Sequence, residues 1–101
     1  MKRPLILQLP VKTADITTES GITWKLEYHL QKNEDGNGRE SFNIRVDKVA
    51  PDGDLDDTAQ TNVATDDYDE VLTVIMYLAE GTVPPSVLED MVEELLPDKA
   101  A

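Results

Sequence analysis

The sequence contains no cysteine, a single histidine, and only one tryptophan and one phenylalanine among its 101 residues. Without cysteine, the chain can form no disulfide, thiolate zinc site or iron–sulfur centre, and it has no cysteine nucleophile. The one histidine has no second imidazole and no thiolate with which to share a transition metal. Basic residues do not cluster with aromatic ones, which argues against direct binding of DNA or RNA. We therefore expect no cofactor and no metal.

Long apolar segments are missing as well. The longest uninterrupted apolar run spans residues 74–79, whereas a helix that crosses a bilayer needs about 20 apolar residues. The chain begins with a basic flank at Lys2 and Arg3, but Gln8 and Pro10 interrupt the apolar residues that follow, and no small-residue cleavage site is present. We predict a strand here rather than a signal peptide, and a cytoplasmic protein without membrane contact.

Acidic residues, by contrast, are abundant and unevenly placed. The formal net charge is −12. Residues 1–32 carry five Lys or Arg against three Asp or Glu, whereas residues 33–101 carry four against eighteen. Such a surface repels nucleic acid and anionic membranes and attracts basic proteins or cations. The charge pattern therefore favours a basic protein partner.

The first two-thirds of the chain predict an antiparallel sheet, because apolar and polar residues alternate in several short segments. Glycine and asparagine in the segment 33–38 predict a reversal between two of these strands. The segment 12–18 either extends the first strand or pairs with it, and residues 51–57 read as a loop. The apolar positions of the predicted strands are Leu5, Leu7 and Leu9; Ile22, Trp24, Leu26, Tyr28 and Leu30; Phe42, Ile44 and Val46; and Ala59, Thr61 and Val63.

The last third predicts two amphipathic helices joined by residues 79–85. Apolar residues recur at helical spacing from Tyr68 to Ala79 and again from Val87 to Leu96. We expect Thr65 or Asp66 to cap the first helix and Gly81 to end it in a left-handed conformation. The predicted fold is a single α+β domain over residues 1–101, with an antiparallel sheet of three or four strands at 4–65. A helical hairpin at 66–96 packs on one face of the sheet, and the other face is solvated.

No pattern in the sequence selects a catalytic residue. His29 falls on the polar face of its predicted strand, where we expect an exposed side chain. Asp52, Asp54 and Asp56 match the beginning of a calcium-binding loop, but Asp57 stands where glycine is required and Val63 where glutamate is required. We expect a solvated turn here, with weak calcium binding as the alternative. We therefore predict that the protein is not an enzyme, while an enzyme that uses metal or carboxylates would require acids converging in a deep pocket.

The second predicted helix carries an unusual acidic face. Glu89 and Glu93, like Asp90 and Glu94, place like charges four residues apart, which costs about 0.2–0.5 kcal/mol per pair. The face is either a solubilising surface or a partner-binding surface that imitates the phosphate backbone of a nucleic acid. The candidate partner-binding residues are Glu89, Asp90, Glu93, Glu94, Asp66, Asp67, Asp69, Glu70, Asp52, Asp54, Asp56 and Asp57.

The segment 83–96 resembles the end of an uncharacterised family of small bacterial domains of unknown function, and the similarity covers about residues 13–96. Val83, Pro85, Leu88, Asp90, Val92 and Leu95 carry it, with Glu94 where aspartate is more usual and Ser41-Phe42 where a Tyr-Gly pair is expected. The resemblance implies no activity. In size, charge and lack of catalytic residues, the chain also resembles small acidic phage-encoded inhibitors such as anti-CRISPR proteins.

Two functions follow as expectations. The preferred one is non-enzymatic protein binding through the acidic surface, most concretely inhibition of a basic nucleic-acid-binding protein by charge mimicry. The alternative is a bacterial accessory domain that forms homodimers or docks through an apolar surface, such as the uncovered sheet face or a patch at Val74, Met76 and Tyr77.

Overall fold

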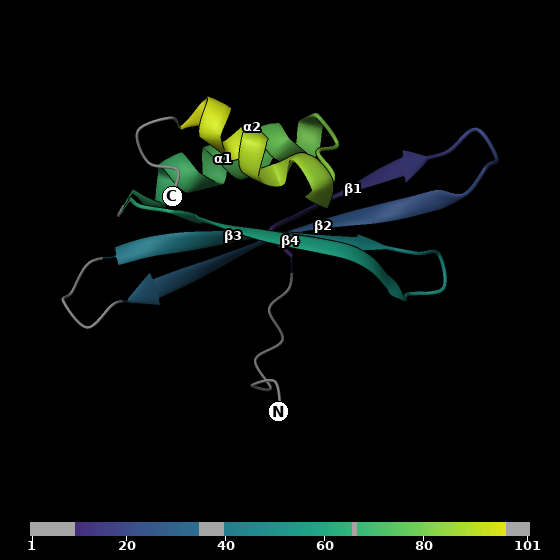
Figure 1. Cartoon of the computed structure of the whole chain (residues 1–101), viewed down its shortest axis with the longest axis horizontal. Coiled ribbons are helices and arrows are strands. Elements are labelled where there is room, and N and C mark those ends of the chain that lie inside the picture. The colour runs from purple at the N-terminus through teal and green to yellow at the C-terminus, as the bar shows by residue number, and fades with distance from the viewer. Residues whose placement is uncertain (1–9, 35–39, 66, 97–101) are drawn as a thin grey trace, which may run out of the picture.

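The computed structural model describes residues 10–34, 40–65 and 67–96, in which a four-stranded sheet is followed by two helices. The strands are β1 (Lys12–Thr17), β2 (Thr23–Glu34), β3 (Glu40–Val49) and β4 (Leu55–Val63). They pair antiparallel in the order β1-β2-β3-β4, so each strand neighbours the next one along the chain. The helices lie together over one face of this sheet (Figure 1). The fold is the α+β arrangement that the sequence predicts.

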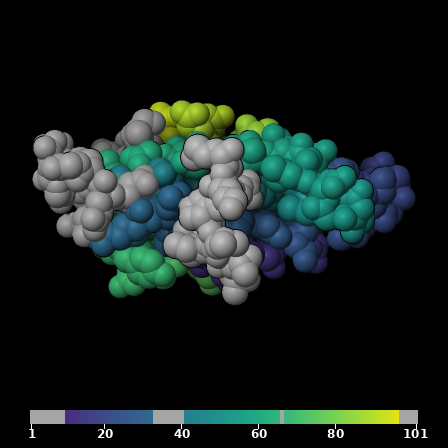
Figure 2. Space-filling view, turned by 90° about the horizontal axis from the view of Figure 1, so that it is seen from below, coloured from purple at the N-terminus to yellow at the C-terminus, as the bar shows by residue number. Residues whose placement is uncertain are grey.

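The alternation in β2 and β3 decides which face of the sheet is buried. Leu26 and Tyr28 on β2 and Ile44 and Val46 on β3 are inaccessible to solvent, and Tyr28 pairs directly with Val46. The intervening residues form the opposite face, where the helices emerge only at the margins of the view (Figure 2). This period of two places one apolar row beneath the helices and one polar row on the open face.

β4 carries an irregularity at its beginning. Asp57 pairs with Lys48, but Leu55 pairs with Val49, so Asp56 is the extra residue of a bulge. Because of this bulge, β4 begins at Leu55, within the segment 51–57 that the sequence predicts as a loop. The predicted strand at 4–10 lies outside the described residues except for residue 10, whereas the segment 12–17 is the edge strand β1.

The two helices are α1 (Tyr68–Glu80) and α2 (Leu88–Leu95), and a short 3₁₀-helix, η1 (Pro85–Val87), leads into α2. Asp67, rather than Thr65 or Asp66, is the N-cap of α1, and its side chain accepts a hydrogen bond from the backbone N–H of Glu70. Thr65 instead accepts a hydrogen bond from the backbone N–H of Asp67. No helix in the described part of the chain is long and apolar enough to cross a membrane.

The predicted left-handed cap at Gly81 is wrong. Gly81 has φ −83° and ψ 1°, and the residue with positive φ is Thr82, at 47°. The backbone N–H groups of Gly81 and Thr82 still bond to carbonyls of the last helical turn. The left-handed residue is therefore Thr82, one position after the predicted Gly81. With Thr82 in this conformation, the backbone N–H of Val83 reaches the carbonyl of Leu78.

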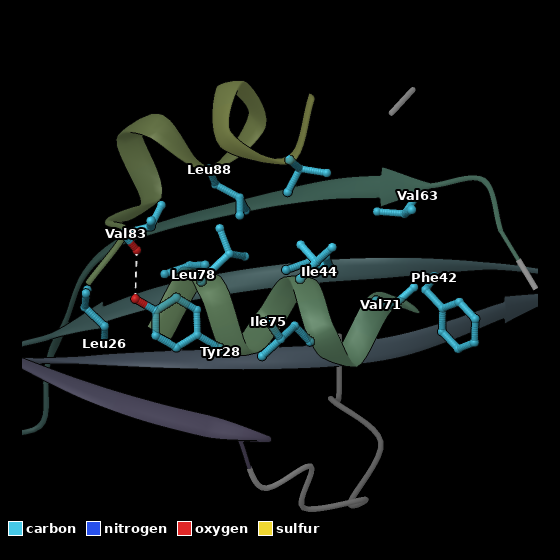
Figure 3. Close-up of a cluster of buried hydrophobic side chains, with 13 residues drawn as sticks. Leu26, Tyr28, Phe42, Ile44, Val63, Val71, Ile75, Leu78, Val83 and Leu88 are labelled. Atoms are coloured by element: carbon cyan, nitrogen blue, oxygen red, sulfur yellow. Dashed lines mark hydrogen bonds between the residues drawn. The ribbon is translucent and has the colours of Figure 1, made fainter. Parts of the chain in front are cut away.

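The core lies between the sheet and the helices, and a buried hydrogen bond crosses it (Figure 3). The Tyr28 hydroxyl donates to the Val83 carbonyl at 3.0 Å across the buried interface. Burial raises the pKa of Tyr28 to about 12, because the phenolate would lose its hydration. The buried apolar residues are Leu26, Tyr28, Phe42, Ile44, Val46, Val63, Val71, Val74, Ile75, Leu78, Val83, Leu88 and Val92.

Candidate functional site

The acidic face of α2 is directed away from the sheet. Leu88 and Val92 bury the inner side of the helix, which leaves Glu89, Asp90, Glu93 and Glu94 exposed on the outer side. None of these four carboxylates makes an ion pair with any residue that the structure describes. The last turn of α2 contains no basic residue, although the helix dipole favours a cation there. The negative charge of this face is therefore not neutralised within the described fold. We call these four residues the α2 acidic face.

Basic residues are missing from a much larger part of the chain. The sequence has no lysine or arginine between Lys48 and Lys99, so β4, α1 and α2 contain none. The described basic residues lie on the first three strands. Lys48, for example, pairs with Asp56 at 3.6 Å and lies 4.6 Å from the centre of the Trp24 ring. The fold consequently separates charge, with an entirely acidic helical layer above a mixed sheet.

The acids at the start of α1 have roles within the helix. Asp67 is the N-cap, and Asp69 and Glu70 occupy the first turn, where the dipole stabilises negative charge. Asp66, the fourth acid predicted for this region, lies outside the described residues. The helix terminus accounts for these positions, as it does for Glu89 and Asp90 in the first turn of α2. Glu93 and Glu94, near the end of α2, lack this explanation and are the stronger evidence for binding.

The acids at 52–57, in the turn after β3 and at the start of β4, also make local contacts. Asp52 accepts a hydrogen bond from the backbone N–H of Asp54, and Asp57 accepts one from that of Thr58. β4 separates this loop from the start of α1, and nine extended residues span about 30 Å. Figure 1 shows the loop and the start of α1 near opposite ends of the sheet. The structure therefore does not gather the twelve predicted acids into one surface.

The open face of the sheet holds a cluster that sequence reasoning missed. The expectation of an exposed His29 is wrong, because this residue is only 7% exposed. Its Nε2 atom lies 3.6 Å from Oε1 of Glu27 and 3.5 Å from Oδ2 of Asp47. Among the described residues, neither ring nitrogen has a hydrogen-bond partner. A buried histidine is thus aimed between two carboxylates without satisfying either ring nitrogen. We call Glu27, His29 and Asp47 the histidine cluster.

Asp47 is held from its other side. Its Oδ1 atom accepts a hydrogen bond of 2.6 Å from the Thr58 hydroxyl and lies 3.3 Å from Nε of Arg45. Its second oxygen, Oδ2, is the one that approaches His29. Beside the cluster, an open depression is lined by Arg45, Asp47, Leu55, Thr58, Ala59 and Gln60.

The register of the hairpin contains the signal that would have found this cluster. Glu27 pairs directly with Asp47, and His29 pairs with Arg45. Like charges directly opposite each other on neighbouring strands destabilise a sheet, so such a pair calls for a compensating group. Counting residues outward from the middle of the predicted reversal at 33–38 would have paired Glu27 with Ile44, whereas the observed register pairs it with Asp47. The position of His29 on a polar face indicated only exposure.

The fold and its two charged regions define a small α+β domain with a four-stranded antiparallel meander and an acidic helical layer. The chain belongs to a family of unknown function, DUF6514, whose model matches residues 8–98. This agrees with the resemblance to an uncharacterised domain family. No curated protein and no solved structure matches the chain.

Proposed function

We propose that this domain is a non-enzymatic binding protein that uses the α2 acidic face to hold a positively charged partner protein. The observation that supports the proposal most strongly is the exposure of four carboxylates on a helix whose layer contains no lysine or arginine. A helix that served only stability would place cations four residues from these acids and near its C-terminal end. The unfavourable arrangement is understandable if a partner supplies the missing cations.

The groove of a nucleic-acid-binding protein is the most concrete partner surface. Such a groove is lined with lysine and arginine that neutralise phosphates. Glu89 and Glu93 lie four residues apart on α2, as do Asp90 and Glu94, so each pair is separated by about 6 Å along the helix axis. Two adjacent rows of negative charge at this spacing would compete with a nucleic acid for the same cations. The domain would then act as an inhibitor, in the manner of small acidic phage-encoded proteins.

The test compares two variants of equal net charge. In the first, the α2 acidic face becomes Glu89→Gln, Asp90→Asn, Glu93→Gln and Glu94→Gln. In the control, the exposed acids Asp15, Glu19, Asp54 and Glu80 are changed to their amides. We expect a basic protein from a lysate of the source organism to be retained by wild type and control, and lost with the first variant.

Varying the salt concentration and adding nucleic acid then test whether the binding is electrostatic and whether it occupies the nucleic-acid groove. We expect the affinity of the retained protein to fall as ionic strength rises, because exposed charges more than about 10 Å apart are screened at 0.1 M salt. Added DNA or RNA should displace the domain. Equal retention by both variants, or an affinity that is independent of salt, would contradict the proposal.

An apolar contact on α1 supports the alternative function. Met76 and Tyr77 are 44% and 57% exposed, whereas Val74, which the sequence groups with them, belongs to the core. Two adjacent exposed apolar side chains could join copies of the domain. Sedimentation at high salt distinguishes the functions, because a homodimer that persists there and dissociates on Tyr77→Ser favours docking through this patch.

A further inference from the structure

We propose that Glu27, His29 and Asp47 bind a divalent transition-metal ion, with zinc as the best-fitting example. This inference does not depend on the α2 acidic face, since the cluster lies on the other side of the sheet. The three side chains project from the paired strands β2 and β3, and their donor atoms all lie within 4.8 Å of one another. A rigid two-stranded platform therefore presents one nitrogen and two carboxylate ligands to a common point.

The distances favour coordination over direct hydrogen bonding. The separations of 3.5 and 3.6 Å between Nε2 and the two carboxylate oxygens exceed an N–H···O hydrogen bond, which is about 2.9 Å. Zinc binds nitrogen and oxygen at about 2.0–2.1 Å, which separates two ligands of a tetrahedral site by about 3.4 Å. The two separations from Nε2 are therefore close to this length, and all three donor atoms lie within 4.8 Å of one another.

Burial and charge give a second, independent reason. His29 is more than nine-tenths buried, and both of its ring nitrogens lack hydrogen-bond partners among the described residues. An unsatisfied buried polar group is costly, as is a pair of opposed carboxylates. One divalent ion at Nε2 would satisfy the histidine and neutralise the opposed acids. Arg45, beside Asp47, balances only one of the two negative charges.

The surroundings of Asp47 are suited to a ligand. The Thr58 hydroxyl holds Oδ1, which leaves Oδ2 directed at the cluster. Hydrogen bonds of this kind orient metal ligands and typically contribute about 10–100-fold to affinity. The adjoining depression leaves space for solvent as a fourth ligand. A mixed nitrogen and oxygen donor set with an imidazole suits zinc, nickel or copper better than calcium or magnesium.

The experiment uses the untagged full chain, because His29 is its only histidine. The imidazole signals in an NMR spectrum therefore report on this site alone. We expect stoichiometric zinc to shift them while excess magnesium and calcium leave them unchanged, and we expect calorimetry to give one zinc site per chain. Imidazole signals that do not change even with zinc in large excess would overturn the proposal, whatever ions the surface acids bind.

Variants identify the ligands. Thr58→Val should weaken zinc binding by about tenfold, and His29→Gln and Asp47→Asn should each weaken it by about 100-fold or more. Asp15→Asn, an exposed acid on β1, makes the same charge change as Asp47→Asn and should bind zinc like wild type. Equal affinity in Asp47→Asn and wild type would overturn the proposed ligand set. Should His29→Gln fail to fold, the NMR titration of the wild type still decides.

Discussion

Tyr28 couples the sheet to the helical layer at the scale of a single residue. Its ring is fully buried, and its hydroxyl donates to the carbonyl of Val83 in the segment between the helices. The sequence predicts the burial of the ring from the alternation of β2. It does not predict the hydrogen bond, because the acceptor lies 55 positions away along the chain, where no local pattern relates the two residues.

Tyr28→Phe should destabilise the protein by about 1–2 kcal/mol, because the buried carbonyl of Val83 loses its donor. Denaturant unfolding at neutral pH measures this difference. Tyr68→Phe is the control, since Tyr68 is 51% exposed and only its ring contacts Phe42, with the ring centroids 6.0 Å apart. A Tyr28→Phe variant as stable as wild type would show that the hydrogen bond contributes nothing.

The same tyrosine gives a dependence on pH. Its pKa is about 12 in the fold and about 10 in an unfolded chain, so the fold favours the protonated form. This stabilisation is complete below pH 10 and is lost as pH rises toward 12, by at most roughly 3 kcal/mol. The measurement is the difference in unfolding free energy between wild type and Tyr28→Phe, in which contributions from other groups cancel. We expect the stability of wild type to fall more steeply over this range.

Thr82 has a left-handed backbone, and no other non-glycine residue that the structure describes has a positive φ. A β-branched side chain at φ 47° is strained, and left-handed backbone costs an L-residue about 1–2 kcal/mol. Thr82→Gly should therefore raise stability by up to about 1 kcal/mol, after the extra entropy of unfolded glycine is subtracted. Thr73→Gly, at an exposed position inside α1, should instead lower stability by about 0.3–0.5 kcal/mol, because glycine favours the helix less than threonine does. Thermal unfolding of the two variants makes the comparison.

At the scale of elements, the periodic patterns in the sequence predict which helices and strands form, but they do not predict where each one begins and ends. The alternation at 22–31 and the helical spacing at 68–79 each identify an element, because periodic burial leaves a periodic sequence. β4 begins earlier than its pattern indicates, since the bulge at Asp56 adds strand residues that alternate out of phase. The N-cap of α1 is Asp67 rather than a residue at 65–66, because three successive polar residues can each cap a helix and the packing of the fold selects one of them.

Asp67→Ala should lower stability by about 1 kcal/mol, because the N–H of Glu70 loses its acceptor and the helix dipole loses a compensating charge. Thermal unfolding measures the change. Asp69→Ala is the matched control, since its side chain is exposed in the first turn and has no capping role. Equal losses in the two variants would assign the effect to charge alone and would contradict the capping role.

At the scale of the whole molecule, the candidate sites differ in how far sequence could reveal them. The α2 acidic face follows from helical spacing, because four acids on one side of a short helix remain together whatever the fold does. The histidine cluster depends on two strands in a particular register, and the sequence showed its members separately. Its discovery required the pairing of Glu27 with Asp47.

Charge repulsion should limit the stability of the whole domain. The net charge of −12 is opposed by no cation in the helical layer, so added salt should raise the melting temperature by screening. A variant with Glu93→Gln and Glu94→Gln should be more stable than wild type by up to about 1 kcal/mol at low salt, because both like-charged pairs are removed while Glu89 and Asp90 remain in the first turn of α2. This gain should shrink at high salt. A variant less stable than wild type would mean that these acids have stabilising partners.

The separation of charge between the layers also makes the molecule an electric dipole. Its described cations lie on β1, β2 and β3, while its two helices carry carboxylates alone as charged side chains. Near a positively charged surface, such a body experiences a torque that turns the helices forward before contact. Collisions would then occur preferentially in one orientation, and the open face of the sheet, with its histidine, would point back toward the solvent.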